Sequence, residues 1–293
     1  TKTAAKEWAA RQEYLILNAE DEGSSLLFGE MLDRYAREVS PTKRGARWEI
    51  LRLERFQKDR IAGIKIKDLR AVDFADWRDR RLREVAAGSV NREMTLMSSA
   101  LNVARRDWGL IKVNPMSDVR KPTKPQPRDR LVKPDELERL GFSAGSDLSK
   151  STARAFHAFR FSIETAMRAG EVCNLTWANV DLDQRVAKLL HTKNGHPRDV
   201  PLSSAAVSLI EALPHADPVF GLDTRRLDAL WRKLRDRAGV IGLTYHDSRH
   251  TAITRLSRKL DVLALARMVG HKDLRQLMTY YNESAADLAK RLD

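Results

Sequence analysis

The chain has 293 residues, of which 42% are hydrophobic and 32% charged, and its formal net charge of +13 gives a sequence pI near 10.0. This length predicts two domains that each bury a core, and the lack of a long apolar run or signal peptide predicts a cytoplasmic protein with no membrane partner. The single cysteine, Cys173, excludes a disulfide framework and a cysteine-rich zinc site, and its apolar neighbours indicate an inert buried thiol. The excess of Lys and Arg favours a polyanionic partner such as nucleic acid, with a generally basic surface as the alternative.

The first part of the chain has the pattern of successive helices. Residues 3–19 are amphipathic, and we expect them to be the last helix of a domain that lies further toward the N-terminus of a longer natural protein. Hydrophobic spacing predicts helices over residues 26–39, from Pro41 through Phe56, over residues 71–85 and over residues 89–108. These segments predict an all-helical domain without strands.

Proline and positive charge concentrate between Pro115 and Pro134, a window that holds five of the ten prolines. Proline at this density prevents a helix and favours an extended, semi-rigid linker. Its basic side chains suit contacts with a rod-like polyanion, and a solvated spacer is the plainer alternative. The candidates for such contacts are Lys121, Lys124, Arg128 and Arg130. The expected division is a terminal helix in residues 1–22, a helical domain in 23–114, the linker in 115–133 and a second domain in 134–293.

The second domain mixes helical and strand patterns. Pro134 stands at an expected helix start, and residues 151–164 predict an apolar helix. Residues 185–191 and 198–202 predict two strands, because Asn194 and Gly195 between them form a strong hairpin signal. Lys193 then lies at the hairpin tip, where its flexible cation can reach into a cleft or stay solvated. The expected fold class is mainly α with a small β-sheet: an all-helical domain joined by a basic, proline-rich linker to a mixed α+β domain.

Residues 244–281 gather the most reactive side chains. His246 and Arg249 are three residues apart, so they share one face of a helix and can converge on one anionic group. Gly270 is expected to end the helical run before it and to leave His271 at a turn. A capping pattern at Asp273 and Gln276 predicts a further helix that carries Tyr280 on its second turn. This arrangement indicates a site for a phosphate and a nucleophile.

Four motifs, in order and spacing, resemble those of the tyrosine recombinases of the phage integrase family, from about residue 130 to 285. They are Thr165-Ala-Met-Arg168-Ala-Gly-Glu171, Thr192-Lys193-Asn-Gly-His-Pro-Arg-Asp-Val-Pro-Leu202, His246-Asp-Ser-Arg249-His250-Thr251, and Gly270-His271 with Tyr280 nine residues on. The helical first domain also resembles the family's core-binding domain. The chain departs from the family at Ala166, Ser248 and Val269, where glycine, leucine and leucine are usual, and none of these removes a reactive group.

The resemblance implies that a tyrosine hydroxyl attacks a DNA phosphate and forms a 3′-phosphotyrosyl link, without metal or cofactor. It assigns phosphate binding to Arg168 and Arg249, and guanidinium groups do match phosphate geometry. It makes Lys193 the general acid, His246 and His271 phosphate ligands or proton carriers, and Tyr280 the nucleophile. Glu171 and His250 are expected to support these catalytic residues.

The resemblance also implies a partner and an assembly. Double-stranded DNA is the expected partner, bound by a homotetramer on paired sites that is a monomer or weak oligomer without DNA. Accessory DNA-bending or directionality factors are compatible with this scheme. The expected function is a site-specific recombinase of bacterial or phage origin that integrates or excises a mobile element.

Other interpretations of the same residues stay open at this point. Arg168 and Glu171 alone would be read as a surface ion pair, and Tyr281 competes with Tyr280 as the nucleophile. His246, His250 and His271 can be written as zinc ligands, although the glutamate base of the metalloprotease helix is missing. Two functions compete with recombination, namely a type IB topoisomerase that relaxes DNA and a catalytically silent DNA-binding regulator.

Overall fold

The computed structural model describes residues 25–123, 128–190 and 196–281, and the chain divides into two compact units, Thr1–Pro127 and Arg128–Asp293. The described chain is mainly helical with one three-stranded antiparallel sheet, which confirms the expected fold class. The expected terminal helix in residues 1–22 lies outside the described residues. No helix in the described ranges has the length and apolar character needed to cross a membrane.

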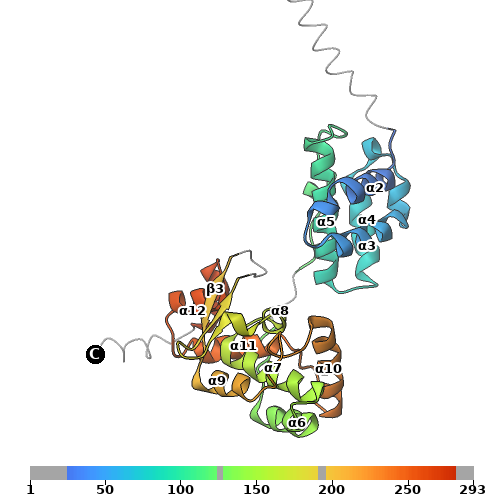
Figure 1. The fold of residues 1–293 in the computed structure, drawn as a ribbon. Helices are drawn as coiled ribbons and strands as arrows, with labels where there is room; N and C mark the ends of the chain where they lie inside the picture. The colour runs from blue at the N-terminus through green and yellow to red at the C-terminus, as the bar shows by residue number, and fades with distance from the viewer. Residues whose placement is uncertain (1–24, 124–127, 191–195, 282–293) are drawn as a thin grey trace, which may run out of the picture. The chain divides into compact units, whose positions relative to one another are not determined.

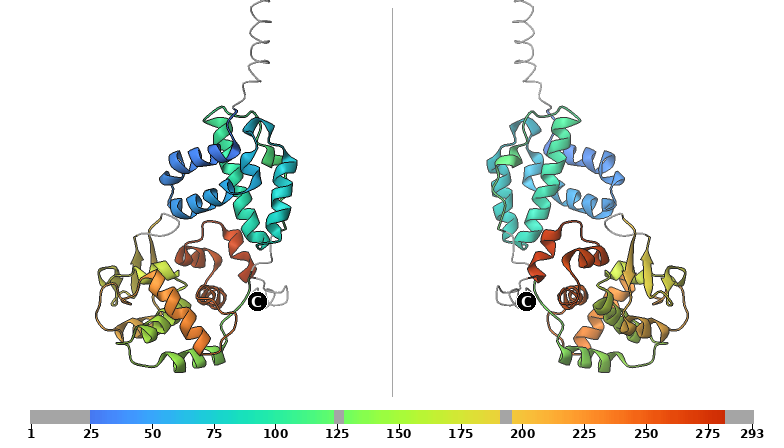
Figure 2. Two further views of the ribbon diagram at one scale, coloured as in Figure 1. Left: turned by 90° about the vertical axis from the view of Figure 1, so that its right-hand side faces the viewer. Right: turned by 90° about the vertical axis from the view of Figure 1, so that its left-hand side faces the viewer.

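Four α-helices form the described part of the first unit, with α5, the longest of them, running along the unit (Figures 1 and 2). Short 3-10 turns connect or follow them. The helices are α2 (Phe28–Glu38), α3 (Ala46–Gln57), α4 (Ala71–Leu82) and α5 (Ala87–Arg106), and the turns are η1 (Ser40–Thr42), η2 (Arg60–Gly63), η3 (Ile66–Asp68) and η4 (Pro115–Asp118).

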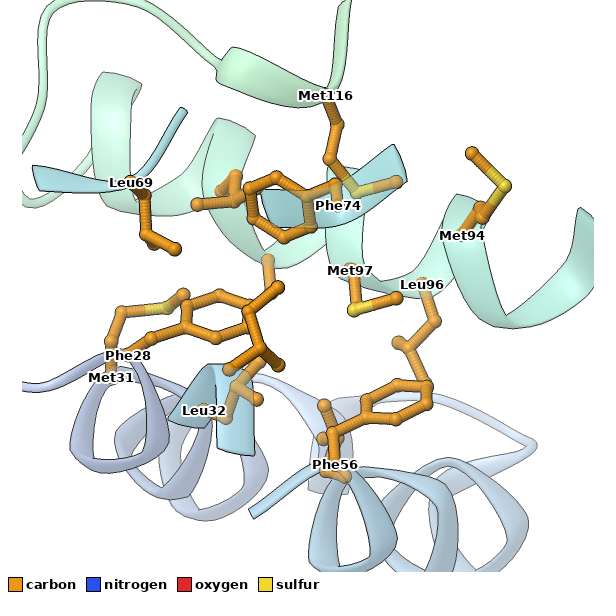
Figure 3. Close-up of a cluster of buried hydrophobic side chains, with 14 of the residues drawn as sticks. Phe28, Met31, Leu32, Phe56, Leu69, Phe74, Met94, Leu96, Met97 and Met116 are labelled. Carbon is orange, nitrogen blue, oxygen red and sulfur yellow. The ribbon is translucent and has the colours of Figure 1, made fainter. Parts of the chain in front are cut away.

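Apolar residues at helical spacing build the core of this unit. Phe28, Met31 and Leu32 of α2 are fully buried because they share one face of the helix. Phe28 meets Phe74 of α4 edge to face, with ring centroids 5.5 Å apart (Figure 3). Such pairs add to the burial of apolar area, which is the main stabilising contribution.

The predicted start of the helix from Pro41 through Phe56 is wrong. Pro41 lies in η1, Lys43 is extended, and α3 begins only at Ala46. The ammonium group of Lys43 donates to the hydroxyl of Tyr35 at 2.6 Å and to the carboxylate of Glu49 at 2.8 Å. These tertiary contacts hold the segment after Pro41 in a turn, which overrides the local preference of proline for the first turn of a helix.

Residues 115–122 lie near the end of the first unit and pack against its helices. Met116 and Val119 are buried in its core. Arg78 donates to the carbonyl of Arg120 at 2.7 Å, and the amide of Asn91 donates to that of Pro122 at 2.9 Å. The side chain of Lys121 is exposed beside these contacts, and Lys124 lies outside the described residues.

Helix α7 is the central element of the second unit, and it contacts α6, α9, α10 and α11 (Figure 1). Phe159 on one side of α7 stacks on Trp231 with centroids 4.0 Å apart, and Phe161 packs on Phe220 with centroids 5.3 Å apart. The helices of this unit are α6 (Pro134–Ala144), α7 (Ser151–Thr165), α8 (Ala169–Cys173), α9 (Ser204–Glu211), α10 (Thr224–Arg237), α11 (Asp247–Leu256) and α12 (Val262–Val269). Cys173 is a buried free thiol, as expected.

The sheet consists of β1 (Val180–Asp181), β2 (Val186–Leu189) and β3 (Arg198–Pro201), with the 3-10 turn η5 (Trp177–Asn179) before β1. β2 pairs antiparallel with both neighbours, and Leu189 lies opposite Arg198. The two strands expected on either side of Asn194-Gly195 are therefore confirmed. The tip between them, with Lys193, lies outside the described residues.

The prediction for the segment after α12 is correct at Gly270 and wrong beyond it. Gly270 ends α12 in the left-handed conformation, with φ at +70°, as expected of a residue that closes a helix. Two 3-10 turns, η6 (Leu274–Gln276) and η7 (Met278–Tyr280), replace the single helix expected to carry Tyr280. The carboxylate of Asp273 accepts from both the backbone and the guanidinium of Arg275, and Leu277 is fully buried. These contacts close the chain into a tighter turn than an α-helix.

Candidate active site

Helix α11 presents the reactive pair expected from the sequence. His246 is its N-cap residue, and Arg249 lies in its first turn with only 3% of its surface exposed. An ionised side chain buried this deeply needs hydrogen-bond acceptors around it. The protein supplies them from two other helices.

The acceptors for Arg249 are backbone carbonyls at the ends of α7 and α12. Its Nη1 donates to the carbonyl of Ala166 and its Nη2 donates to that of Val269 at 2.7 Å. The last carbonyls of a helix have no partner within the helix and carry partial negative charge, so they suit a guanidinium. Burial, followed by the like charge of Arg168, lowers the pKa of Arg249 to about 9, and the group remains a cation at neutral pH.

Arg168 and Glu171 form the ion pair that their spacing allows, and a third residue completes it. Arg168 is the N-cap residue of α8, and its Nη1 donates to Glu171 at 2.9 Å. Arg198 of β3 donates two hydrogen bonds, of 2.9 and 2.7 Å, to the same carboxylate. Its Nε–H donates to the carbonyl of Met268 at 2.9 Å. Burial alone would raise the pKa of Glu171, but Arg198 and Arg168 lower it to about 2. The carboxylate is therefore a fixed anion between two arginines.

Arg198 is a site residue that the sequence does not single out, because it lies in a segment that reads as a strand. Its side chain is 10% exposed and lies on the inward face of β3, two residues before the buried Val200. A basic residue at an inward strand position was the available signal, because such a charge needs a buried partner.

His271 follows Gly270 and enters this cluster. Burial and then the charges of Arg249, Arg168 and Arg198 lower its pKa to about 4, so the imidazole is neutral at pH 7. Its Nδ1 is buried and has no hydrogen-bond partner among the described residues. Burial and Arg249 likewise lower the pKa of His246. The site thus offers two neutral imidazoles next to three guanidinium groups.

The hydroxyl of Tyr280 lies at 2.6 Å from Nδ1 of His250, and the two rings pack with centroids 5.2 Å apart. Burial raises the pKa of Tyr280, against the lowering effect of Arg249, so the phenol is protonated at neutral pH. Tyr281 instead donates its hydroxyl to the carbonyl of Leu260 at 2.7 Å. The two adjacent tyrosines therefore differ in their contacts: the hydroxyl of Tyr280 hydrogen-bonds to a side chain of α11, and that of Tyr281 to a backbone carbonyl.

The linker arginines have protein partners. Arg128 donates to the carboxylate of Asp247, and Arg130 donates to that of Glu136. Within the described ranges, no three His, Cys, Asp or Glu side chains are grouped to hold a metal ion.

The arrangement matches one chemical task. Arg168 and Arg249 supply positive charge from two different helices, neutral imidazoles can donate or accept protons, and a phenol lies beside them. Preorganised guanidinium groups stabilise the charge that develops on a five-coordinate phosphorus. The geometry suits attack of a phenol oxygen on a phosphodiester.

Comparison with known proteins agrees with this chemistry. The protein-family model described as "Phage integrase family" matches residues 130–287 of this chain. A Haemophilus influenzae protein named as an integrase/recombinase is 37% identical over 294 residues, which cover 98% of this chain and 97% of that protein. The shufflon-specific DNA recombinase of Escherichia coli is 34% identical over 275 residues, which cover 89% of this chain and 70% of that protein.

Two solved structures share the fold. The Tn1549 transposon integrase in complex with a circular intermediate DNA superposes with a TM-score of 0.74 at 16% identity, covering 92% of this chain and 99% of that one. A lambda integrase tetramer bound to a Holliday junction has a TM-score of 0.70 at 17% identity, covering 88% of this chain and 78% of that one.

Proposed function

The chain belongs to the phage integrase family of tyrosine recombinases, and we propose that Tyr280 is the nucleophile with which it cleaves and rejoins DNA. The protein is a tyrosine-type, site-specific DNA recombinase. The observation that carries the proposed roles is Arg249, which is buried between two helix ends and interacts electrostatically with Arg168 and Tyr280.

In the first step the Tyr280 hydroxyl oxygen attacks the scissile phosphorus. A bond forms between this oxygen and phosphorus while the hydroxyl proton passes to a neighbouring base. The bond from phosphorus to the 5′-oxygen breaks, and the 5′-oxygen takes up a proton. The product is a 3′-phosphotyrosyl link and a free 5′-hydroxyl. The 5′-hydroxyl of a partner strand then attacks that link and releases Tyr280. One ester bond is exchanged for another in each step, so neither ATP nor a cofactor has to supply energy.

Arg168 and Arg249 bind the non-bridging oxygens of the phosphate. Among the described residues the guanidinium of Arg168 donates only to Glu171, which leaves further N–H groups for an oxyanion. His246 and His271 are neutral at pH 7 and add further donors, and His271 brings a buried nitrogen that has no partner in the described part of the chain. Glu171 fixes the direction of Arg168.

Proton transfer completes the assignment. The hydrogen bond between His250 and Tyr280 supports His250 as the group that holds the nucleophile before attack. A phenol has a pKa of about 10 and is a poor nucleophile unless a neighbour accepts its proton. Lys193, the general acid in this proposal, supplies the proton to the leaving 5′-oxygen from the hairpin between β2 and β3.

Covalent trapping tests the proposal. On a nicked substrate that loses the strand beyond the break, the wild-type protein should accumulate a DNA adduct, and peptide mapping should place the adduct on Tyr280. Tyr280→Phe should form no adduct while binding DNA with an affinity close to that of the wild type. The neighbouring variant Tyr281→Phe is the matched control and should still form the adduct. Adducts that persist in Tyr280→Phe and vanish in Tyr281→Phe would reverse the assignment.

The proposed partner is double-stranded DNA in the cytoplasm of a bacterial cell, bound by four copies of the chain on paired sites. The lambda integrase tetramer on a Holliday junction supports this assembly, since it shares the fold. Free of DNA, the chain is a monomer or weak oligomer. Accessory DNA-bending or directionality factors are compatible with it, and integration or excision of a mobile element is the outcome. Lys121 is a candidate DNA contact, because its charge is exposed.

A further inference from the structure

One face of helix α11 carries side chains of the site, and a second face contacts another segment of the chain. His246, Arg249 and His250 belong to the site. Asp247 and Thr251 are four residues apart and therefore share a different face of the helix.

Residues 128–132, which we call the anchor segment, contact that second face at both positions. Nε and Nη2 of Arg128 donate to the two carboxylate oxygens of Asp247, each at 2.7 Å. The backbone N–H of Val132 donates to the hydroxyl oxygen of Thr251 at 2.9 Å. The anchor segment thus attaches to the same helix that carries the reactive side chains.

Asp247 depends on these contacts because its side chain is only 4% exposed. Burial alone would raise its pKa, but Arg128 and the backbone N–H of Thr244 lower it, so Asp247 is charged at neutral pH. Nη2 of Arg128 also donates to the carbonyl of Gly242. One arginine therefore ties the loop before α11 and the first turn of α11 together. A buried carboxylate that loses such a partner is strongly disfavoured.

We propose that Arg128 is a positioning residue of the recombinase, which holds the first turn of α11 so that His246 and Arg249 meet the phosphate correctly. This inference rests on the proposed function of those two residues. It also gives Arg128 a role that differs from a contact to DNA, because the paired edge of its guanidinium already binds a carboxylate. Misplacement of a reacting group by about 1 Å costs on the order of a hundredfold in rate.

The test separates binding from cleavage. Arg128→Gln is compared with the wild type in affinity for a single DNA site at several salt concentrations, and in the adduct-forming rate on the nicked substrate at saturating protein. We expect unchanged affinity and salt dependence, with cleavage slower by about tenfold or more. Arg232→Gln is the matched control, because it removes the same charge from the second unit, while Asp228, with which Arg232 pairs at 3.0 Å, lies on its own helix α10. It should cleave like the wild type.

Further variants guard against a folding defect. Thermal unfolding of each variant shows whether it is folded at the assay temperature. Arg128→Lys keeps the charge but not the two-pronged geometry, so its rate should fall between those of wild type and Arg128→Gln. If the pair acts as a unit, Asp247→Asn in the Arg128→Gln background should cost little further rate. Thr251→Val, which removes the second attachment without changing any charge, should also slow cleavage and leave affinity intact.

The opposite pattern overturns the inference. Weaker binding in Arg128→Gln, with a salt slope smaller by about 1 and unchanged cleavage at saturation, would make Arg128 a DNA phosphate contact. Independent, additive losses from Arg128→Gln and Asp247→Asn would also contradict it. A wild-type protein that forms no adduct would instead refute the proposed function, so the two failures are distinguishable.

Discussion

Three arginines in the site use the same side chain in three ways. Arg198 directs Nε and both terminal nitrogens to protein acceptors, so it serves to hold Glu171 and the end of α12. Arg249 is anchored by two carbonyls and lies beside the others. Arg168 has one partner, Glu171, among the described residues and is 21% exposed. Arg168, the most exposed of the three, keeps the most N–H donors for a substrate.

Glu171 gives a pH-dependent prediction for stability. Its pKa in the folded protein is about 2, below the ordinary value of 4.5, so the folded state favours the ionised form. The resulting stability is present above about pH 4.5 and is lost as pH falls toward 2. We expect Glu171→Gln to lower the free energy of unfolding by about 3 kcal/mol at pH 7, because it unpairs two arginines. Between pH 7 and pH 3.5 the gap between the two proteins should narrow by about 1 kcal/mol.

Denaturant unfolding at the two pH values measures this gap. Glu164→Gln should show a gap that narrows in the same direction, because Arg255 lowers the pKa of Glu164 against the effect of burial. A gap that stays constant with pH would show that Glu171 titrates normally in the folded protein. The comparison of two proteins at each pH removes the contribution of the other carboxylates that titrate in the same range.

Side chains of the site differ in how far the sequence could identify them. Arg168, Arg249 and Tyr280 lie in motifs whose spacing is itself informative. Arg198 and Arg128 look like ordinary basic residues in the sequence, since their importance comes from partners 27 and 119 residues away. Contacts at that separation are created by the fold and leave no local pattern.

Elements with strong periodicity were predictable, and those fixed by single tertiary contacts were not. The strands on either side of Asn194-Gly195 and the helix end at Gly270 follow from local conformational preferences. The turn after Pro41 and the 3-10 turns around Tyr280 depend on the partners of Lys43 and on the burial of Leu277. Propensity is a weak signal where a buried or charge-assisted contact decides the backbone.

The end of α7 gives a prediction at the scale of the element. Ala166 closes that helix with φ at +55°, a left-handed conformation that is unfavourable for residues other than glycine, and its carbonyl accepts from Arg249. Ala166→Gly should change the free energy of unfolding by less than about 1 kcal/mol, since relief of strain offsets the lost buried methyl group and the greater freedom of the unfolded chain.

Ala166→Val should destabilise by about 2 to 4 kcal/mol, because a β-branched side chain disfavours this conformation and overfills a fully buried position. It should also slow cleavage, since the carbonyl that anchors Arg249 would move. Denaturant midpoints and adduct formation measure the two effects. A Val variant as stable and active as the Gly variant would show that neither the backbone strain nor the packing at this helix end matters.

At the scale of the whole molecule, 53 basic residues against 40 acidic ones leave a charge of +13. Many arginines are nevertheless paired within the protein, as with Arg80 and Asp59 or Arg255 and Glu164. Net charge therefore explains attraction to a polyanion and its salt dependence, while the specific chemistry depends on a few unpaired donors.

Assembly gives the last prediction. Residues 282–293 lie outside the described residues, and in the sequence Ala285, Leu288 and Leu292 form an i, i+3, i+7 apolar stripe. A stripe of this kind on a short helix is stable only when it packs on a protein surface. In a tetramer on paired DNA sites, a neighbouring copy can provide that surface.

Deleting residues 284–293 should therefore leave the affinity for a single DNA site close to that of the full chain and reduce the pairing of two sites about tenfold or more, as a loss of about 1.4 kcal/mol per contact implies. Gel-shift titrations with one-site and two-site DNA measure the two quantities on the same protein. The matched control is Ala285→Ser with Leu288→Gln and Leu292→Gln, which keeps the length of the chain and removes only the apolar stripe. Equal losses on one-site and two-site DNA would mean that the stripe packs within its own chain and stabilises the fold rather than the assembly.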